Sequence, residues 1–192
     1  GFIGGSITQG SLSSTPQKCY AYLVYEWWVR TFPQAEFKYV NAGIGGTTSQ
    51  FGVARAQDDL LDAEPDFVIA EFSVNDESTG HFEETYEGLV RKILSSKSHP
   101  ALMLVHNVCY NNGASAELVH SRIARHYNIP SVSMQSTLYK ALLNCRFDNR
   151  RITPDDLHPN DCGHELVSMV ITKRLEQIKN TVKAEYESCE TE

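Results

Sequence analysis

The sequence has no long hydrophobic run and no cluster of basic residues. None of its apolar stretches approaches the roughly 20 residues that cross a bilayer, so we expect no membrane partner. The formal net charge is -7, and Lys and Arg are dispersed along the 192 residues. Phosphate binding requires clustered positive charge, and we therefore expect no nucleic-acid partner either.

The chain is also poor in cysteine patterns. No two of the five cysteines form a CxxC pair, and their number is odd; they are Cys19, Cys109, Cys145, Cys162 and Cys189. This distribution argues against a disulfide framework and against a zinc site. It favours a reducing compartment, and so the cytoplasm over secretion.

The length fits one domain over residues 1–192, and there is no internal repeat or low-complexity segment. The chain opens with Gly1 directly before an apolar run. We therefore expect it to be a fragment or a processed chain, with any targeting segment already removed.

Strand-like and helix-like patterns alternate along the chain. Short apolar runs predict five strands, at residues 2–5, 37–43, 66–76, 101–108 and 129–134. Helical spacing of apolar residues predicts the intervening helices, at residues 18–32, 48–63, 82–96, 115–128, 136–144 and 163–182. This alternation predicts an α/β fold, a three-layer α/β/α sandwich around a five-stranded parallel sheet. The expected strand order is the flavodoxin-like 2-1-3-4-5.

Three unusual loops follow the first three strands. Ser6 follows the first strand, the glycine-rich segment 41–49 contains the second strand's end, and Ser73-Val74-Asn75-Asp76 follows the third. Because strand 1 lies between strands 2 and 3 in this order, the loops should meet at the carboxyl edge of the sheet. Sheets of this kind place their binding sites there.

These loops carry groups suited to acyl transfer. A serine hydroxyl such as Ser6 becomes a nucleophile when a base takes its proton. The attacked carbonyl then needs hydrogen-bond donors for its oxyanion. The Ser6 N–H, the Gly46 N–H and the Asn75 amide could form an oxyanion hole, with Asp76 as a structural neighbour.

One histidine is placed to act as the base. His158 follows Asp155 by three residues, and Pro154 and Pro159 favour a fixed turn around them. A carboxylate and an imidazole at this spacing can form the orienting pair of a catalytic triad. Asp156 competes with Asp155 for that role. A metal site built on Asp155, His158 and His164 lacks a convincing further ligand.

The sequence resembles the GDSL/SGNH hydrolase superfamily of serine esterases and lipases. The resemblance rests on four ordered blocks, Gly4–Thr8, Asn41–Thr47, Ser73–Asp76 and Asp155–His158, and extends over nearly the whole chain. Gly5 stands where the family usually has Asp, and Ser73 where it usually has Gly. The resemblance selects Asp155 over Asp156, identifies Gly46 as the oxyanion glycine, and implies a serine mechanism without metal or cofactor.

Within that superfamily the blocks "GFIGGSITQGS" and "EFSVNDES" are most similar to bacterial enzymes that remove O-acetyl groups from plant polysaccharides. The resemblance implies an acetylated carbohydrate as substrate. It also implies an additional carbohydrate-binding or β-sandwich domain in the full chain.

Several residues allow a second interpretation. Ser6 could cap a helix, Gly46 could serve only a turn, and Asn75 could form an Asx turn. Trp27 and Trp28 could stack on sugars, although their helical register favours core packing. Three residues after the fourth strand could line a substrate cleft or form an ordinary turn: Tyr110, Asn111 and Asn112. The other histidines are expected at the surface or in packing.

Other functions also remain open at this stage. A lipid acylhydrolase or thioesterase would use the same triad. A flavodoxin-like protein could cradle a phosphate or flavin on the Ser6 loop, and an inactive carbohydrate-binding module would bind without turnover. The flavodoxin-like interpretation leaves the Asp155–His158 and Ser73–Asp76 blocks unexplained, and the complete triad argues against the inactive module.

Overall fold

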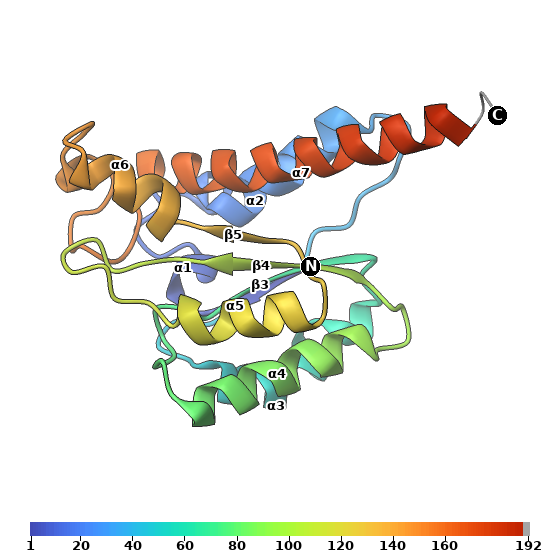
Figure 1. Cartoon of the computed structure of the whole chain (residues 1–192), viewed down its shortest axis with the longest axis horizontal. Coiled ribbons are helices and arrows are strands. Elements are labelled where there is room, and N and C mark those ends of the chain that lie inside the picture. Colours follow the sequence, from blue (N-terminus) through green and yellow to red (C-terminus); the bar gives the residue numbers. More distant parts are fainter. Residues whose placement is uncertain (190–192) are drawn as a thin grey trace.

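The computed structural model describes residues 1–189, and the side chains of residues 1–184. Five parallel strands form one sheet in the order β2-β1-β3-β4-β5, which confirms the predicted topology (Figure 1). The strands are β1 (Phe2–Gly4), β2 (Asn41–Gly43), β3 (Phe67–Glu71), β4 (Ala101–His106) and β5 (Ser131–Ser133).

Helices cover both faces of the sheet, so the α/β/α sandwich is also confirmed (Figure 1). One face carries α2 (Tyr20–Thr31) and α7 (Asp161–Cys189). The other carries α3 (Ser49–Asp59), α4 (Gly80–Leu94) and α5 (Glu117–His126).

The central strands supply both cores. Successive side chains of a strand point to opposite faces. Ile69 of β3 therefore enters the core under α2 and α7, while its neighbours Val68 and Ala70 enter the core under α3, α4 and α5. All three are fully buried, which explains why this segment is continuously apolar rather than alternating.

Several predicted elements differ in the structure. The predicted strand 66–76 ends at Glu71, because the N–H groups of Asn75 and Asp76 turn back to the Phe72 carbonyl. The predicted strand 37–43 is reduced to Asn41–Gly43, because β1 begins beside it only at Phe2, which pairs with Asn41. The predicted helix 136–144 begins as a π-helical turn over Gln135–Tyr139 and continues as α6 (Lys140–Leu143). The remaining short elements are α1 (Ser6–Gln9) and three 3₁₀ turns at Pro16–Lys18, Leu61–Ala63 and Asn149–Arg151.

Trp27 and Trp28 pack as their helical register predicts. Both are partly buried against the core under α2 and α7, and the Trp28 ring lies 5.3 Å from the ring of Phe67. Phe67 begins β3, so this aromatic group lies at the amino edge of the sheet, away from the loop that carries Ser6.

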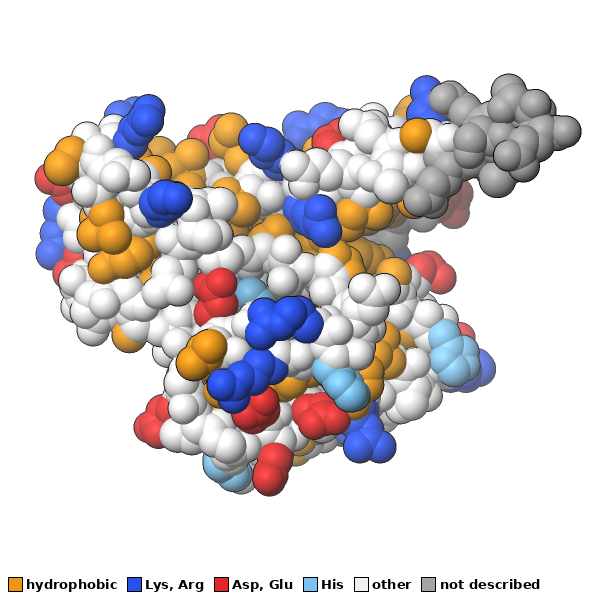
Figure 2. All heavy atoms as spheres, in the orientation of Figure 1, with side chains coloured by type: hydrophobic (Ala, Val, Ile, Leu, Met, Phe, Trp, Pro, Cys, Tyr) orange, Lys and Arg blue, Asp and Glu red, His pale blue; other side chains and the backbone are white. Residues whose placement is uncertain are grey.

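The surface is mixed in charge. On the face shown in Figure 2, acidic side chains lie among the basic ones rather than leaving a broad basic surface. Within residues 1–189, no helix combines the length and the apolar character needed to cross a membrane.

Candidate active site

Ser6 lies where β1 passes directly into α1. It is the first residue of that helix and only 8% exposed. The helix lasts four residues, to Gln9, and is capped by Gly10, whose φ of 97° is the left-handed conformation that glycine adopts most readily. Thr8 ties the helix to α2 through a buried 2.8 Å hydrogen bond between its Oγ1 and the Tyr20 hydroxyl. The serine hydroxyl is therefore held at the carboxyl edge of the sheet.

His158 and Asp155 reach Ser6 from the other end of the chain. The Ser6 Oγ lies 2.8 Å from His158 Nε2, and His158 Nδ1 lies 2.7 Å from Asp155 Oδ2. When Nδ1 is protonated and its N–H donates a hydrogen bond to the carboxylate, Nε2 is free to accept a hydrogen bond from the serine hydroxyl. The predicted serine, imidazole and carboxylate thus form one continuous hydrogen-bonded chain.

The turn itself fixes the carboxylate of Asp155. Its Oδ1 accepts hydrogen bonds from the backbone N–H of His158 at 2.7 Å and of Leu157 at 3.1 Å. Partial burial alone would raise the pKa of Asp155. These bonds and the His158 side chain outweigh burial and lower that pKa to about 2. The carboxylate is therefore ionised at any pH at which the imidazole would act as a base.

Asp156 points elsewhere. It accepts from the Asn149 side chain and forms an ion pair with Arg150 at 3.0 Å. Its φ of 66° turns the chain so that its carbonyl accepts from the Tyr110 N–H. The Asp156 side chain is 20% exposed and holds this turn through these contacts.

Gly46 and Asn75 present unused donors near Ser6. Among the described residues, nothing accepts a hydrogen bond from the Gly46 N–H or from Asn75 Nδ2. Gly46 has a φ of 70°, the left-handed region, so glycine suits this position for conformational reasons. The loop passes beside the nucleophile, because a Cβ on Gly45 would lie 3.6 Å from that of Ser6.

Ser6 contributes a third donor. The first N–H groups of a helix have no partner within the helix, and Ser6 opens α1. The Asn75 side chain packs directly against Gly5, the residue before Ser6. The three predicted donors thereby belong to segments that meet at this serine, and their role as an oxyanion hole stays a prediction.

The comparison with protein-family models gives one match, over residues 2–166, to the GDSL-like lipase/acylhydrolase family. The chain belongs to the GDSL-like lipase/acylhydrolase family. This membership separates it from the flavodoxin-like binding proteins that share its strand order.

Ser73, which stands where the GDSL pattern usually has glycine, fits its position in this fold. Ser73, in place of the usual glycine, has no positive φ and is fully buried. Its hydroxyl lies 3.1 Å from the carbonyl oxygen of Asn107, to which it donates. The backbone before Asn75 therefore does not require glycine here.

The solved structures similar to this GDSL-like chain include a carbohydrate esterase. A two-domain esterase (CEX) active on acetylated mannans, co-crystallised with mannopentaose, is 71% identical with a TM-score of 0.92. The match covers 93% of this chain and 49% of that chain, so this chain spans about half the length of that esterase.

Two less similar proteins are an acetylxylan esterase and a thioesterase. The acetylxylan esterase Axe2 from Geobacillus stearothermophilus is 20% identical with a TM-score of 0.74, and the match covers 90% of this chain and 91% of Axe2. At that identity the likeness concerns the fold alone. Thioesterase 1/protease 1/lysophospholipase L1 of Escherichia coli (strain K12) is 25% identical over 189 residues, covering 93% of this chain and 83% of that protein.

The three residues that could line the substrate cleft differ in exposure. Tyr110 is 4% exposed and belongs to the core under α2 and α7, so its burial favours the packing alternative over the substrate cleft. Asn111 and Asn112 are exposed, and Asn112 Oδ1 accepts from the Ala114 N–H in a local turn. Their contact with substrate stays a prediction.

His164 is not available as a metal ligand beside His158. Its Nδ1 accepts from the Tyr20 N–H at 3.2 Å, and its Nε2 lies 3.3 Å from the Ser11 carbonyl oxygen. Within the described part of the chain, no three His, Cys, Asp or Glu side chains are gathered closely enough to hold a metal ion.

Sequence reasoning missed two buried partners of the site. Arg55 of α3 donates to the carbonyl oxygens of Ala42 and Gly4, at 2.7 and 3.1 Å, and so ties the ends of β1 and β2 together. His120 of α5 contacts Asp76. Arg55 and His120 occupy inward positions of amphipathic helices, and a polar residue on such a stripe was the only available signal.

Proposed function

We propose that this domain is a serine esterase that removes O-acetyl groups from acetylated plant polysaccharides or oligosaccharides, with acetylated mannan as its first candidate substrate. The observation that carries the proposal is the hydrogen-bonded chain from Ser6 through His158 to Asp155. The mannan assignment draws on the 71% identical esterase, which is described as active on acetylated mannans.

In the first half of the reaction, Ser6 Oγ attacks the acetyl carbonyl carbon while His158 Nε2 takes its proton. The ionised Asp155 stabilises the imidazolium that forms. The carbonyl oxygen becomes an oxyanion and accepts hydrogen bonds from Ser6 N–H, Gly46 N–H and Asn75 Nδ2. The C–O bond to the sugar then breaks, and His158 gives its proton to the departing sugar hydroxyl.

In the second half, water attacks the acetyl group on Ser6. His158 takes a proton from that water, and the same three donors hold the second oxyanion. Breakdown releases acetate and returns the proton to Ser6. No step requires a metal or cofactor, because the nucleophile, base and donors are all supplied by the chain.

Hydrolysis of p-nitrophenyl acetate by wild type and Ser6→Ala tests the mechanism. We expect Ser6→Ala to lose at least a thousandfold in kcat, since the triad acts as a unit. Ser96→Ala, in the turn after α4, removes a serine whose hydroxyl only donates to Ile93 and serves as the control. Equal rates for wild type and Ser6→Ala would end the proposal.

Acetate release from acetylated mannan, xylan and pectin tests the substrate. We expect the highest rate on mannan. Binding of acetylated oligosaccharide without turnover would instead identify an inactive binding module.

A lipid acylhydrolase or thioesterase is the second candidate, favoured by the 25% identity to thioesterase 1/protease 1/lysophospholipase L1. A series of p-nitrophenyl esters from acetyl to palmitoyl separates the two candidates. Preference for long chains would overturn the acetylesterase assignment.

We also propose that residues 1–192 form one hydrolase domain of a multidomain protein, joined to a carbohydrate-binding or β-sandwich domain. The proposal is supported by the two-domain description of the 71% identical esterase and by the 49% of its length that this chain matches.

A further inference from the structure

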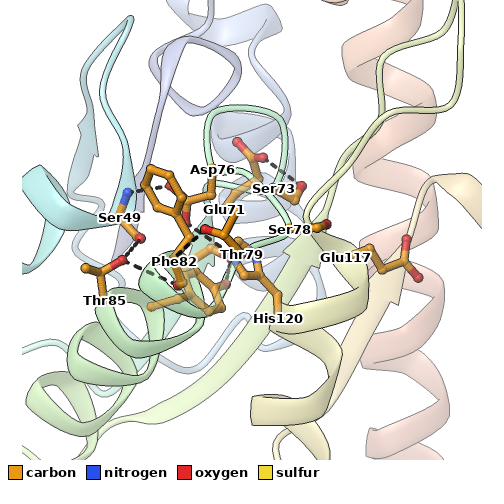
Figure 3. Close-up of polar contacts among 12 residues, drawn as sticks. Ser49, Glu71, Ser73, Asp76, Ser78, Thr79, Phe82, Thr85, Glu117 and His120 are labelled. Atoms are coloured by element: carbon orange, nitrogen blue, oxygen red, sulfur yellow. Dashed lines mark hydrogen bonds and ion pairs between the residues drawn. The ribbon is translucent and has the colours of Figure 1, made fainter.

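The Asp76 side chain is fully buried, and its two oxygens contact two different helices (Figure 3). Its Oδ1 accepts from the Ser49 N–H of α3 at 2.9 Å. Its Oδ2 lies 3.1 Å from Nε2 of His120, on α5. Asp76 also directly follows Asn75, so it joins three segments at one point.

The contact with Ser49 fixes the far end of the Gly46 loop. Ser49 begins α3 immediately after that loop, and the preceding residue, Thr48, forms no side-chain cap. Asp76 supplies the missing acceptor from outside the helix, and a carboxylate at a helix N-terminus is also electrostatically favourable.

The near end of the same loop is held by the nucleophile's own segment. Ile44 N–H donates to the Gly4 carbonyl at 3.1 Å, and Gly45 N–H donates to Gln9 Oε1 at 2.9 Å. Gly46 therefore sits between two anchors, one on β1 and α1 and the other on Asp76.

The contact with His120 prevents the carboxylate from turning. The His120 side chain is fully buried, and its ring is stacked on Tyr86 with centroids 3.6 Å apart and an interplanar angle of 9°. The backbone around Asp76 is equally constrained, since the N–H groups of Asn75 and Asp76 both donate to the Phe72 carbonyl.

We infer that Asp76 is a positioning residue that sets the spacing between the oxyanion donors Gly46 and Asn75, and that His120 holds Asp76 in the orientation this requires. The inference rests on the proposed esterase function. Asp76 touches no reacting atom, so its effect should concern the oxyanion in the transition state rather than substrate binding.

The variants separate positioning from simple stabilisation. Asp76→Ala removes both acceptors, and we expect kcat on p-nitrophenyl acetate to fall about a hundredfold with KM within threefold of wild type. Asp76→Asn keeps an oxygen for Ser49 N–H, and a change of His120 tautomer lets its amide donate to Nε2. We expect this conservative variant to stay within about fivefold of wild-type kcat.

His120→Phe tests the second anchor, and it keeps the inference testable if the Asp76 variants fail to fold. The phenyl ring keeps the stack on Tyr86 and loses the Nε2 hydrogen bond, and we expect kcat to fall about tenfold. Ile123→Ala, one turn further along α5 and in the buried core, is the control. It should lower the unfolding midpoint and leave kcat unchanged.

Affinity for phenylboronic acid, which forms a tetrahedral adduct with a serine, should weaken in parallel with kcat across these variants. Wild-type kcat for Asp76→Ala, or an unchanged kcat with a raised KM, would overturn the inference while leaving the esterase function intact. An equal loss of kcat in Ile123→Ala would overturn it too. Absence of activity in wild type would remove the esterase function itself, and the inference with it.

Discussion

Asn75 lies so close to Gly5 that a Cβ atom on residue 5 would stand 2.3 Å from Asn75 Oδ1 and 3.0 Å from Cγ. Asn75 Oδ1 is buried without a hydrogen-bond partner among the described residues, so the amide is held by this packing rather than by a bond. The glycine that replaces the usual family aspartate is thus the surface on which the proposed oxyanion donor rests.

Gly5→Ala should therefore displace Asn75 and weaken the oxyanion hole. We expect kcat to fall about a hundredfold, the usual effect of losing one such donor, with little change in KM. Steady-state kinetics on p-nitrophenyl acetate measure this. Gly80→Ala is the matched control, since a Cβ there meets nothing within 4 Å, and it should behave as wild type. Full activity in Gly5→Ala would show that Asn75 is not needed in this position.

Asp155 and Asp156 are adjacent acids with different predicted effects. Asp155→Asn keeps an oxygen for the turn but places an amide against His158 Nδ1, which favours the wrong tautomer. We expect a loss of about a thousandfold in kcat. Asp156→Asn removes an ion pair with Arg150, whose side chain is 57% exposed, and should cost less than fivefold. Similar losses in both variants would contradict the assignment of Asp155.

Stability should depend on pH through buried groups, among them His106, His164 and Glu71. Burial lowers the pKa of His106 to about 3 and that of His164 to about 4, so the unfolded chain binds these protons more tightly. Both histidines make the fold less stable as pH falls below 6.5. Burial raises the pKa of Glu71 to about 7, above its usual 4.5, so this carboxyl opposes them over the same range.

Glu71→Gln should therefore make the protein more sensitive to acid. Between pH 6.5 and 4.5 we expect its free energy of unfolding to fall more steeply than that of wild type, by about 1.4 kcal/mol per pH unit for one proton. Urea unfolding at several pH values measures both slopes. Parallel slopes would mean that Glu71 is ionised in the folded protein in this range.

The features that the sequence predicts well are local or periodic. Asp155 and His158 are three residues apart in a proline-flanked turn, so their contact needed little knowledge of the rest of the fold. The alternation of elements indicated a parallel sheet, and the flavodoxin-like order placed the Ser6, Gly46 and Asn75 loops at one edge. The family blocks then selected residues within those loops.

The features that it missed depend on how helices are seated on the sheet. Asp76 and His120 are 44 residues apart, and their contact requires one particular rotation of α5. Tyr110 follows a strand and is polar at its tip, yet the loop folds it into the core. Helical periodicity identifies a buried stripe without identifying which side chain of another element each member meets.

The base His158 and its carboxylate Asp155 lie within four consecutive residues, while the nucleophile Ser6 comes from the opposite end of the chain. Only one distance in the triad, from Ser6 to His158, therefore has to be set by the assembly of the whole domain. Insertions and replacements elsewhere in the fold can accumulate without misaligning the acid–base pair, provided that this single junction between the first and last thirds of the protein is preserved. The 155–158 turn can therefore be kept unchanged when the surrounding loops are redesigned for another ester.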